Sequence, residues 1–406
     1  MKYFKNTELA RLYHVSEKSI RNWIAAAAAN PDKSSLSLYE HRGRLYIANT
    51  SNNIAVIEEL VAHGKKFKNN RGRRTLRPKP ELYSCYSAKH IVDILTNIDI
   101  HSEIPLQYSY FNGGAKEWST YAQRLSQEQT PNMLTSTVEL LGLSNDYIQR
   151  LVRLKNHVSV IDLGQGDASP ARDLLNGLSQ SGKLKRYVAI DFSKDMMKIA
   201  ENNVRTWVGD VPVQTYERDL SYDRFDDVLK HGAYNTDFAS SVNLILLLGG
   251  TLTNFPSPVN ALRNINASMG RNDVLIYCLK LDTLSSRRFF DFANTGQPLS
   301  SRHSMLLELL NIDSSMYDVE QLYDQENKCR VIRVKLKIDI TLEVEVEGML
   351  RSLDLHKDQR ILIWRYWHQT AMDVLGEFDQ NGFDLLQATL TEDKEYLLLI
   401  AKAGTA

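Results

Sequence analysis

The chain has little cysteine, no long apolar run and no net charge, and each absence excludes a class of protein. Cys85, Cys278 and Cys329 are too far apart for a disulfide framework or for the paired spacing of a zinc site. We therefore expect a reduced, cytoplasmic setting and no bound metal. No charged and then apolar leader opens the chain, and the longest apolar run, around Leu244–Leu248, is much too short to span a bilayer.

The absence of net charge hides an uneven distribution. The chain has 49 Lys and Arg residues against 49 Asp and Glu residues, but residues 1–80 hold 16 basic and 6 acidic side chains. The first 80 residues therefore carry a charge of +10 and the rest of the chain −10. Such segregation predicts a separate N-terminal domain that meets a polyanion. A length of 406 residues leaves room for two or three domains.

The middle of the chain is typical of half of a nucleotide-binding fold. Val158–Leu163 is a short, mostly apolar run, as expected of a strand buried in a parallel sheet. Gly164 and Gly166 follow directly, and their missing Cβ atoms let the backbone turn sharply against a ligand. A helical pattern over residues 171–178 and a second apolar run that ends at Asp191 complete the unit. A carboxylate at that strand end can accept hydrogen bonds from both hydroxyls of a ribose.

Two absences in this stretch select the class of ligand. A dinucleotide-binding turn has a third glycine where this chain has Ser169, and the Lys-Ser/Thr pair of a P-loop is missing. The turn is preceded by an acidic residue, Asp162, and lacks a phosphate-binding group. This combination suits S-adenosylmethionine. The stretch resembles the first motifs of a class I methyltransferase, and an ordinary glycine turn is the alternative.

The next two strand ends extend this site. Asp219 and Leu220 follow the apolar run Val211–Tyr216, and the central run Val242–Leu248 leads into a Gly-Gly-Thr-Leu-Thr loop that ends at Asn254. Because the carboxyl ends of parallel strands meet at one edge of a sheet, we expect Asn254 to face the same crevice as the glycine turn. In the methyltransferase fold an acidic residue at the position of Asp219 contacts the adenine amino group; a helix N-cap is the alternative.

Residues outside this sheet are expected to complete the pocket. Residues 81–157 are mostly helical in pattern, with an aromatic loop at Tyr108–Ala115 that makes Tyr110 a candidate substrate-binding residue; packing in the core is the alternative. Residues 331–347 alternate between apolar and charged side chains and predict a half-exposed antiparallel hairpin bent near 337–339. We assign this hairpin and the aromatic cluster Trp364, Tyr366, Trp367 and His368 to a substrate lobe over roughly residues 285–375.

The N-terminal residues 1–64 resemble a DNA-binding domain. Thr7–Ile24 has two short helical patterns with Thr7 and Ser16 at the N-cap positions, which resembles a helix-turn-helix. Ser37–Ile47, around Arg42-Gly43, resembles the wing of winged DNA-binding domains. An ordinary small helical hairpin is the alternative. The apolar residues expected to meet between the two helices are Leu9, Ala10, Val15, Ile20 and Trp23.

Residues 65–80 form a basic segment with eight basic residues, no acid, two prolines and a glycine. Both a solvated linker between domains and an arm that contacts phosphates fit this composition. Phosphate contacts would give affinity without a choice of sequence. The residues expected to contact DNA are Ser16, Lys18, Ser19, Arg21 and Asn22 in the second helix, Arg42 and Arg44 in the hairpin, and Arg71, Arg73 and Arg74 in the basic segment.

Together the motifs GGTLTNF, DLGQGD, AIDFS and YSYFNGG resemble the histidine-specific methyltransferase family, whose best-known member makes trimethylhistidine in ergothioneine synthesis. The resemblance covers roughly residues 104–403 and implies an α/β, Rossmann-like doubly wound sheet within a domain at 81–406. It also implies that Asp219 and Leu220 bracket adenine and that Asn254 holds the carboxylate of an amino-acid substrate. The predicted cofactor-binding residues are Asp162, Gly164, Gly166, Asp191, Asp219 and Leu220, and the predicted substrate-binding residues are Asn254 and Tyr110.

Three departures from the family pattern argue against histidine as the acceptor. Histidine-methylating members have a lysine after the glycine turn, where this chain has Ser169-Pro170, and adjacent tyrosines where this chain reads Gln127–Pro131. They also have a Glu-x-Ser-x-Lys-Tyr stretch that grips the substrate amine, whereas Leu362–His368 has no carboxylate. An α-ammonium in a closed pocket needs an anionic partner. We therefore expect a preserved cofactor half and a different acceptor.

Two functional hypotheses follow. The first is an S-adenosylmethionine-dependent methyltransferase with a DNA-binding headpiece, in which alignment and desolvation of the acceptor supply most of the acceleration. The second is a dimeric transcriptional regulator whose methyltransferase-like domain senses S-adenosylmethionine or another small molecule without turnover. Direct methylation of DNA is disfavoured, because the Asn/Asp-Pro-Pro-Tyr/Phe loop and the Pro-Cys pair of DNA methyltransferases are missing. His231, His303 and His368 are candidate bases, each with a structural role as the alternative.

Overall fold

The structure is a computed structural model in which two compact units are distinguished. One unit holds residues 1–75 with 338–340, and the other holds residues 76–337 with 341–406. No helix in the described part of the chain combines the length and the apolar character that a membrane span needs. The structure describes residues 3–404 except 14, 16, 30, 32–33, 70–72, 129, 231–239 and 286–297, and it describes only the backbone of residues 62–69.

The first unit packs helices against a hairpin, in the order α1 (Asn6–Leu12), α2 (Glu17–Ala29), β1 (Leu38–His41), β2 (Arg44–Ile47) and α3 (Ser51–Asn69). Leu9 and Ile20 are buried in its core, and Ala10, Val15 and Trp23 pack against them, which confirms the predicted meeting of these side chains. The predicted N-cap at Thr7 is wrong, because α1 begins at Asn6 and Thr7 lies in its first turn. Ser16 lies outside the described residues.

The hairpin forms around the predicted two-residue turn. Arg42 and Gly43 both have positive φ, 52° and 71°, and His41 pairs with Arg44 across them. Such turns match the twist of the flanking strands, and glycine adopts this backbone without strain. The buried side chain of Asn53 on α3 holds the base of the hairpin: its Oδ1 accepts from Ser37 N at 2.9 Å, and its Nδ2 donates to the carbonyls of Ser37 and Ala48, both at 2.8 Å.

The basic segment 65–80 is regular over much of its length instead of forming a continuous linker. The helix α3 continues to Asn69, because residues 65–69 contain no glycine or proline that would end it. Arg74–Leu76 forms a strand, β3, and the backbone N of Arg74 donates to the carbonyl of Asp339 at 2.9 Å. The division between the two units falls after residue 75, within the segment 65–80.

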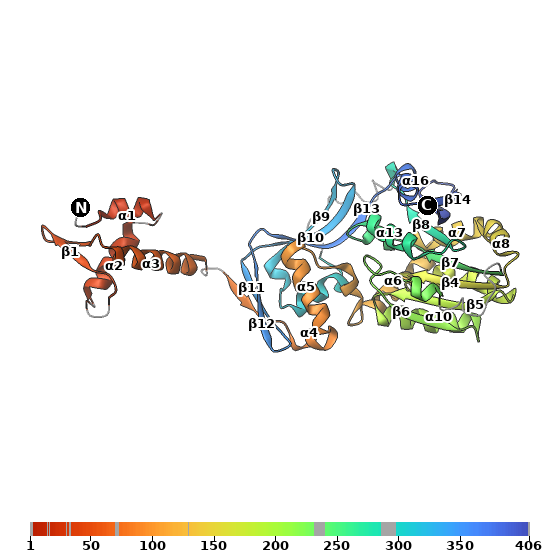
Figure 1. Ribbon diagram of the computed structural model, residues 1–406, viewed down its shortest axis with the longest axis horizontal. Helices are drawn as coiled ribbons and strands as arrows, with labels where there is room; N and C mark the ends of the chain where they lie inside the picture. The colour runs from red at the N-terminus through yellow and green to blue at the C-terminus, as the bar shows by residue number, and fades with distance from the viewer. Residues whose placement is uncertain are drawn as a thin grey trace. The chain divides into compact units, whose positions relative to one another are not determined.

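The second unit is built on a seven-stranded sheet of order β14-β15-β8-β7-β4-β5-β6 (Figure 1). Neighbours from β8 to β6 are parallel, whereas β15 is antiparallel to both β8 and β14. The chain builds outwards from β4 in one direction and then in the other, so the carboxyl ends of β4, β5 and β7 surround a switch point. The strands are β4 (His157–Leu163), β5 (Leu184–Asp191), β6 (Val213–Glu217), β7 (Ser241–Leu247), β8 (Val274–Lys280), β14 (Phe383–Leu390) and β15 (Tyr396–Ala403).

Helices cover both faces of this sheet, because neighbouring strand residues alternate between two apolar cores. Val160 lies in one core and Ile161 in the other, as the period of a strand requires. The result is the doubly wound α/β architecture that the sequence predicted. One face is covered by α7 (Met133–Leu143), α8 (Asn145–Val152), α9 (Arg172–Gln180) and α10 (Lys194–Val208), and the other by α11 (Asp226–Lys230), α13 (Pro258–Ser268) and α16 (Ala371–Gln380).

Two three-stranded sheets are formed by five strands from the second half of the chain together with β3. Their orders are β13-β10-β9 and β12-β11-β3, so β10 and β11 do not form the predicted hairpin. The strand β10 has β9 and β13 on its two sides and therefore no edge left for β11. The predicted alternation is present, since alternate residues of β11 are buried. The strands are β9 (Tyr317–Asp324), β10 (Cys329–Leu336), β11 (Ile340–Val346), β12 (Met349–Leu355) and β13 (Arg360–Trp367).

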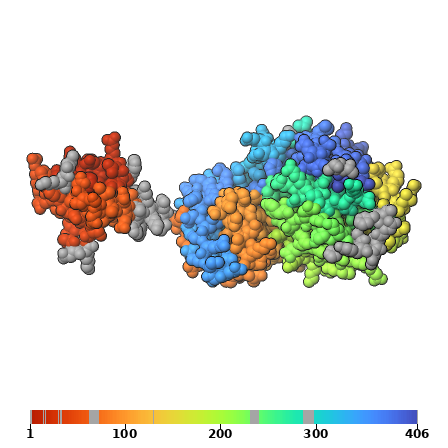
Figure 2. All heavy atoms as spheres, in the orientation of Figure 1, coloured from red at the N-terminus to blue at the C-terminus, as the bar shows by residue number. Residues whose placement is uncertain are grey.

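Most of the remaining helices precede the strands of the large sheet in the sequence, as the pattern of residues 81–157 predicted. The helix α5 packs against β12, although some 250 residues separate them in the sequence, and Figures 1 and 2 show these segments side by side. The predicted Gly-Gly-Thr-Leu-Thr-Asn loop contains one short helix, α12 (Thr251–Asn254). The other elements are α4 (Pro80–Cys85), α5 (Ala88–His101), η2 (Leu106–Tyr110), α6 (Gly114–Gln127), η3 (Ser169–Ala171), α15 (Ser301–Leu309) and η5 (Ser314–Met316).

Candidate functional site

A cavity of about 970 Å³ opens at the carboxyl ends of the parallel strands in the second unit. Ligands of doubly wound folds bind at this edge, beside the switch point of the strand order. The wall of the cavity brings together every residue that the sequence predicted to bind cofactor or substrate. These residues are Asp162, Gly164, Gly166, Asp191, Asp219, Leu220, Asn254 and Tyr110.

The glycine turn after β4 forms the floor of the cavity because it has no room for side chains. Gly164 and Gly166 have φ values of +58° and +56°. A Cβ atom on Gly164 would lie 2.6 Å from Cγ2 of Thr251, and one on Gly166 would lie 2.4 Å from the ring of Trp118. Both glycines are therefore required by contact with neighbouring elements and by backbone conformation together.

Gln165, between these glycines, was missed by the sequence reasoning, which weighed only the glycines. Its side chain is 6% exposed and lines the cavity. Neither its Nε2 nor its Oε1 has a hydrogen-bond partner within the described ranges. A buried amide without partners is unfavourable by about 1–3 kcal/mol for each unsatisfied group. A ligand that offers both a donor and an acceptor would satisfy it.

Two carboxylates beside the turn have raised pKa values. Burial raises the pKa of Asp162 to about 7, although the hydroxyl of Tyr187 donates to its Oδ2 at 2.9 Å. Burial also raises the pKa of Asp191 to about 6, against the hydrogen bond that its Oδ1 accepts from Ser193 N at 2.8 Å. Both side chains therefore titrate near neutral pH, and a cationic ligand would favour their charged forms.

Asp219 and Leu220 form a further part of the wall after β6. Burial raises the pKa of Asp219, whose Oδ1 accepts from Ser221 N at 2.9 Å and whose Oδ2 accepts from Gln107 Nε2 at 3.3 Å. The first of these bonds closes a local turn, and α11 begins only at Asp226, so Asp219 is not the N-cap of that helix. The arrangement leaves its carboxylate on the cavity wall beside the buried Leu220.

The aromatic loop serves both of the roles weighed for it. Tyr108 is buried, donates to Asp93 Oδ2 at 2.7 Å and contacts Phe111 and Phe192 within a ring cluster. Tyr108 and Tyr110 both line the cavity, and the guanidinium of Arg302 lies 5.5 Å from the ring centroid of Tyr110. The sequence did not identify Phe192, which lines the cavity directly after Asp191.

The opposite end of the cavity is built by α12 and β13. The Oδ1 of Asn254 is buried without a hydrogen-bond partner among the described residues. Trp364 and Tyr366 line the cavity with their ring centroids 6.1 Å apart and their planes 26° apart. Trp367 instead donates through Nε1 to the carbonyl of Phe255 at 2.8 Å. With His368 buried against Tyr323 and Tyr366, the aromatic cluster divides between pocket and core as expected.

The candidate histidine bases do not converge on the cavity. His303 is absent from its wall, and burial followed by the charge of Arg302 lowers the pKa of His303 to about 3. His368 is likewise absent from the wall. His231 lies outside the described residues. His90 does line the cavity, and burial lowers its pKa as well.

The candidate DNA-contacting residues are largely exposed in the described part of the first unit. On α2, Lys18, Arg21 and Asn22 are exposed and Ser19 is partly buried. At the hairpin turn, Arg42 and Arg44 are both exposed. In and before β3, Arg74 is exposed and Arg73 is partly buried. Ser16 and Arg71 lie outside the described residues.

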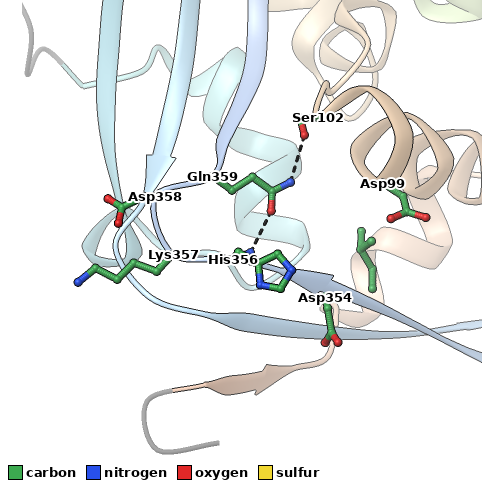
Figure 3. Close-up of a pocket in the computed structure, with 8 residues that line it drawn as sticks. Asp99, Ser102, Asp354, His356, Lys357, Asp358 and Gln359 are labelled. Atoms are coloured by element: carbon green, nitrogen blue, oxygen red, sulfur yellow. Dashed lines mark hydrogen bonds between the residues drawn. The ribbon is translucent and has the colours of Figure 1, made fainter. Parts of the chain in front are cut away.

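A smaller hollow of about 500 Å³ lies between the end of α5 and the turn from β12 to β13 (Figure 3). Its contacts fix this turn: His356 N donates to Gln359 Oε1 at 2.9 Å, and Gln359 Nε2 donates to Ser102 Oγ at 3.1 Å. Lys335 pairs with Asp358 at 2.9 Å. These contacts give the hollow a structural role, and it contains none of the predicted site residues.

We expect Gly166→Ala to destabilise the second unit by about 2–4 kcal/mol, because it adds backbone strain and a clash with Trp118. Thermal unfolding together with tryptophan fluorescence measures both effects. Gly177→Ala is the matched control, since Gly177 lies within α9 with open space around its Cβ position, and alanine there should stabilise the helix by up to about 1 kcal/mol. Equal stability of the two variants would contradict the close contact between the glycine turn and Trp118.

Residues 91–287 match the family model described as "Histidine-specific methyltransferase, SAM-dependent", where SAM is S-adenosylmethionine. No curated protein gives a significant match to the chain. A SAM-dependent methyltransferase from Clostridium acetobutylicum is 11% identical with a TM-score of 0.37, over 71% of this chain and 99% of that one. Magnesium protoporphyrin IX methyltransferase from Synechocystis with bound SAH is 12% identical with a TM-score of 0.37, over 73% and 98%.

A third solved structure, the glycopeptide N-methyltransferase MtfA with (S)-adenosyl-L-methionine, is 12% identical with a TM-score of 0.31, over 65% of this chain and 93% of that one. The family match covers the glycine turn, the strand end at Asp191 and the loop that ends at Asn254, which are the motifs behind the resemblance. Residues 91–287 are thus similar to a SAM-dependent methyltransferase domain, and the cofactor that this match supports is S-adenosylmethionine.

Proposed function

We propose that this protein transfers a methyl group from S-adenosylmethionine to a small-molecule acceptor other than histidine, and that its N-terminal unit binds DNA. The observation that carries the enzymatic part is the convergence of Gly164, Gln165, Gly166 and Asp191 on one cavity, with an unsatisfied amide at its floor. The bound cofactor supplies an activated methyl group on a sulfonium. The residues of the chain supply its binding and the alignment of the acceptor.

Each part of the cofactor has a matching group in the cavity. The amide of Gln165 offers a donor and an acceptor to the amino and carboxylate groups of the methionine part. The carboxylate of Asp191, at the end of β5, suits the two ribose hydroxyls. Asp219 accepts well from an adenine amino group, and Phe192 and Leu220 provide apolar surface for the ring.

The acceptor half does not suit an α-amino acid. Trp364 and Tyr366 occupy the stretch in which histidine-methylating relatives have a carboxylate and a serine. Glu103 does line the cavity, but it forms an ion pair with Arg365, and both side chains are only 14% exposed. A carboxylate that is already paired is a poor partner for an α-ammonium group. We therefore retain the proposal of a non-histidine acceptor.

The DNA-binding part is supported by the side chains on one helix and one turn. Lys18, Arg21 and Asn22 are exposed on α2, with Arg21 and Asn22 three and four residues after Lys18, and Arg42 and Arg44 are exposed at the turn of the hairpin. A helix with exposed cationic and amide side chains, followed by a basic hairpin, suits the major groove and the adjacent phosphates. These exposed side chains support our proposal that the unit is a winged helix-turn-helix.

The sensing hypothesis uses the same cavity and differs only in turnover. The family match favours an enzyme, since it spans both the cofactor motifs and the loop that ends at Asn254. Formation of S-adenosylhomocysteine in the presence of an acceptor separates the two hypotheses.

Calorimetric titration of the full chain should show micromolar binding of S-adenosylmethionine. We expect Gln165→Ala and Asp191→Ala each to weaken binding by about tenfold or more, since each removes hydrogen bonds to a buried ligand. Asp195→Ala is the control, because Asp195 is an exposed carboxylate four residues away that does not line the cavity. Absence of binding to the intact chain would contradict the assigned site, and so would equal affinities of all variants.

Binding should also strengthen as the pH rises from about 5.5 to 8. Asp162 has a pKa of about 7 and Asp191 of about 6, so both are mainly protonated at the low end of this range. A cationic ligand stabilises the charged carboxylates, so their pKa values are lower in the complex than in the free protein. At low pH the ligand must displace a proton in order to bind, and its affinity is therefore weaker. Calorimetry across this pH range should show a shallower dependence for Asp162→Asn. A pH-independent dissociation constant of the intact chain would refute this linkage.

Fluorescence anisotropy with a labelled DNA duplex tests the headpiece. We expect Arg21→Ala to weaken binding by about fivefold to a hundredfold and to reduce its salt dependence, because a phosphate or base contact is lost. Arg153→Ala removes the same charge from an exposed position in the second unit and should have little effect. If both variants weaken binding equally, net charge and not the face of α2 determines affinity.

A further inference from the structure

We propose that the methyl acceptor is an uncharged aromatic amine, stacked on the aromatic wall formed by Trp364 and Tyr366, with an N–H group donated to Asn254. This inference rests on the proposed methyltransferase function and assigns the substrate class of its acceptor end. The relevant residues come from α12 and β13, outside the turns that bind the cofactor in the proposal above.

The aromatic wall is held rigidly in place. Trp364 and Tyr366 are stacked, and the guanidinium of the buried Arg330 lies 5.3 Å from the centroid of the Trp364 ring. The Nε1 of Trp367 donates to the carbonyl of Phe255, which ties β13 to the end of α12. A Cβ on Gly250 would already lie 3.4 Å from the Tyr366 ring. Rigid aromatic surface of this kind favours flat, apolar ligands.

The charges at this end do not suit a zwitterion. Glu103 is paired with Arg365, so the pair presents little net charge to the cavity. Among the described residues of the wall, the cationic side chains Lys89 and Arg218 lie on α5 and after β6, and Arg218 is paired with Asp227 at 3.0 Å. Neither α12 nor β13 adds an unpaired charge to this wall. A carboxylate or an α-ammonium would therefore lose its hydration there without compensation.

One polar group on the wall specifies what the flat ligand must offer. Asn254 Oδ1 is buried and unpaired within the described part of the chain, and a carbonyl oxygen can only accept. An N–H group on the acceptor ring would satisfy it. This bond would also fix the nitrogen within the cavity and orient its lone pair, which is the alignment that methyl transfer requires.

The chemistry balances without a protein base. The nitrogen lone pair forms the new N–C bond while the C–S bond breaks, and the electron pair of that bond stays on sulfur, which becomes a neutral thioether. The methylated aromatic ammonium is a strong acid and gives its extra proton to water. The absence of His303 and His368 from the wall therefore does not prevent the reaction.

Ligand-detected NMR on the full chain, with and without S-adenosylhomocysteine, tests this class through matched pairs. Each pair compares an aromatic amine with the same ring lacking the amine, such as 3-aminoquinoline and quinoline. We expect the amine to bind about tenfold more tightly, as one hydrogen bond to a buried acceptor allows. L-histidine and other α-amino acids should not compete.

Two variants assign the contacts. Asn254→Ala should remove the difference between amine and ring while leaving the affinity for quinoline unchanged. Trp364→Leu should weaken both ligands by a similar factor of about ten or more. Trp207→Leu is the matched control, because Trp207 is a partly buried tryptophan on α10 outside the cavity wall, and it should change neither. Retained binding of S-adenosylhomocysteine shows that each variant is folded.

The outcomes separate this inference from the proposed function. No binding of S-adenosylhomocysteine by the intact chain contradicts the cofactor site itself, whatever the rings do. Normal binding of S-adenosylhomocysteine with equal affinities for amine and ring, or with displacement by histidine, overturns the acceptor class alone. Ring binding that Trp364→Leu leaves unchanged overturns it as well, because the ligand would then lie elsewhere.

Discussion

The close approach of three elements at the glycine turn is the constraint on which the cavity depends. Because Gly164 and Gly166 lack side chains, Thr251 of α12 and Trp118 of α6 can lie directly against the backbone after β4. A Cβ at either position would force the side chain of Thr251 or the ring of Trp118 to move. The turn thereby brings α6, β4 and α12 together around the cavity. Gln165 lines this cavity, and its amide has no hydrogen-bond partner among the described residues.

The electrostatics of the cavity follow from the same construction. Its wall contains the carboxylates of Asp93, Glu103, Asp162, Asp191, Glu217, Asp219 and Asp223, against the cations Lys89 and Arg218 in the described part of the chain. Burial raises the pKa of Asp162 and of Asp191, because loss of water disfavours their charged forms more than their hydrogen bonds favour them. Such a cavity favours a cationic ligand, because a nearby positive charge stabilises carboxylates that burial has removed from water.

Much of this site was predictable because its signals are local in the sequence. The turn at Gly164, the strand end at Asp191 and the loop at Asn254 each follow an apolar run, and the geometry of parallel strands brings such positions to one edge. Gln165 and Trp118 could not be predicted in the same way. The burial of Gln165 depends on the packing around the turn, and Trp118 reaches it from a helix nearly fifty residues earlier.

The prediction of a hairpin between β10 and β11 was wrong, because strand pairing also depends on distant segments of the chain. Alternation at 331–347 identifies two buried faces, but it contains no information about which strands become neighbours. The strand β10 pairs with β9 and β13, and β11 joins β12 and β3, so pairing partners come from distant segments.

In the proposed function, the cofactor and acceptor groups lie on different elements, so one half of the site can follow the family while the other departs from it. The cofactor groups lie on turns of the large sheet, where a change would disturb the core on both faces. Trp364 and Tyr366 lie on a strand of a smaller sheet, so different side chains there alter the pocket without repacking β4, β5 or β7. In the proposed function, aromatic side chains at these positions select the acceptor, and the turns of the large sheet bind the methyl donor.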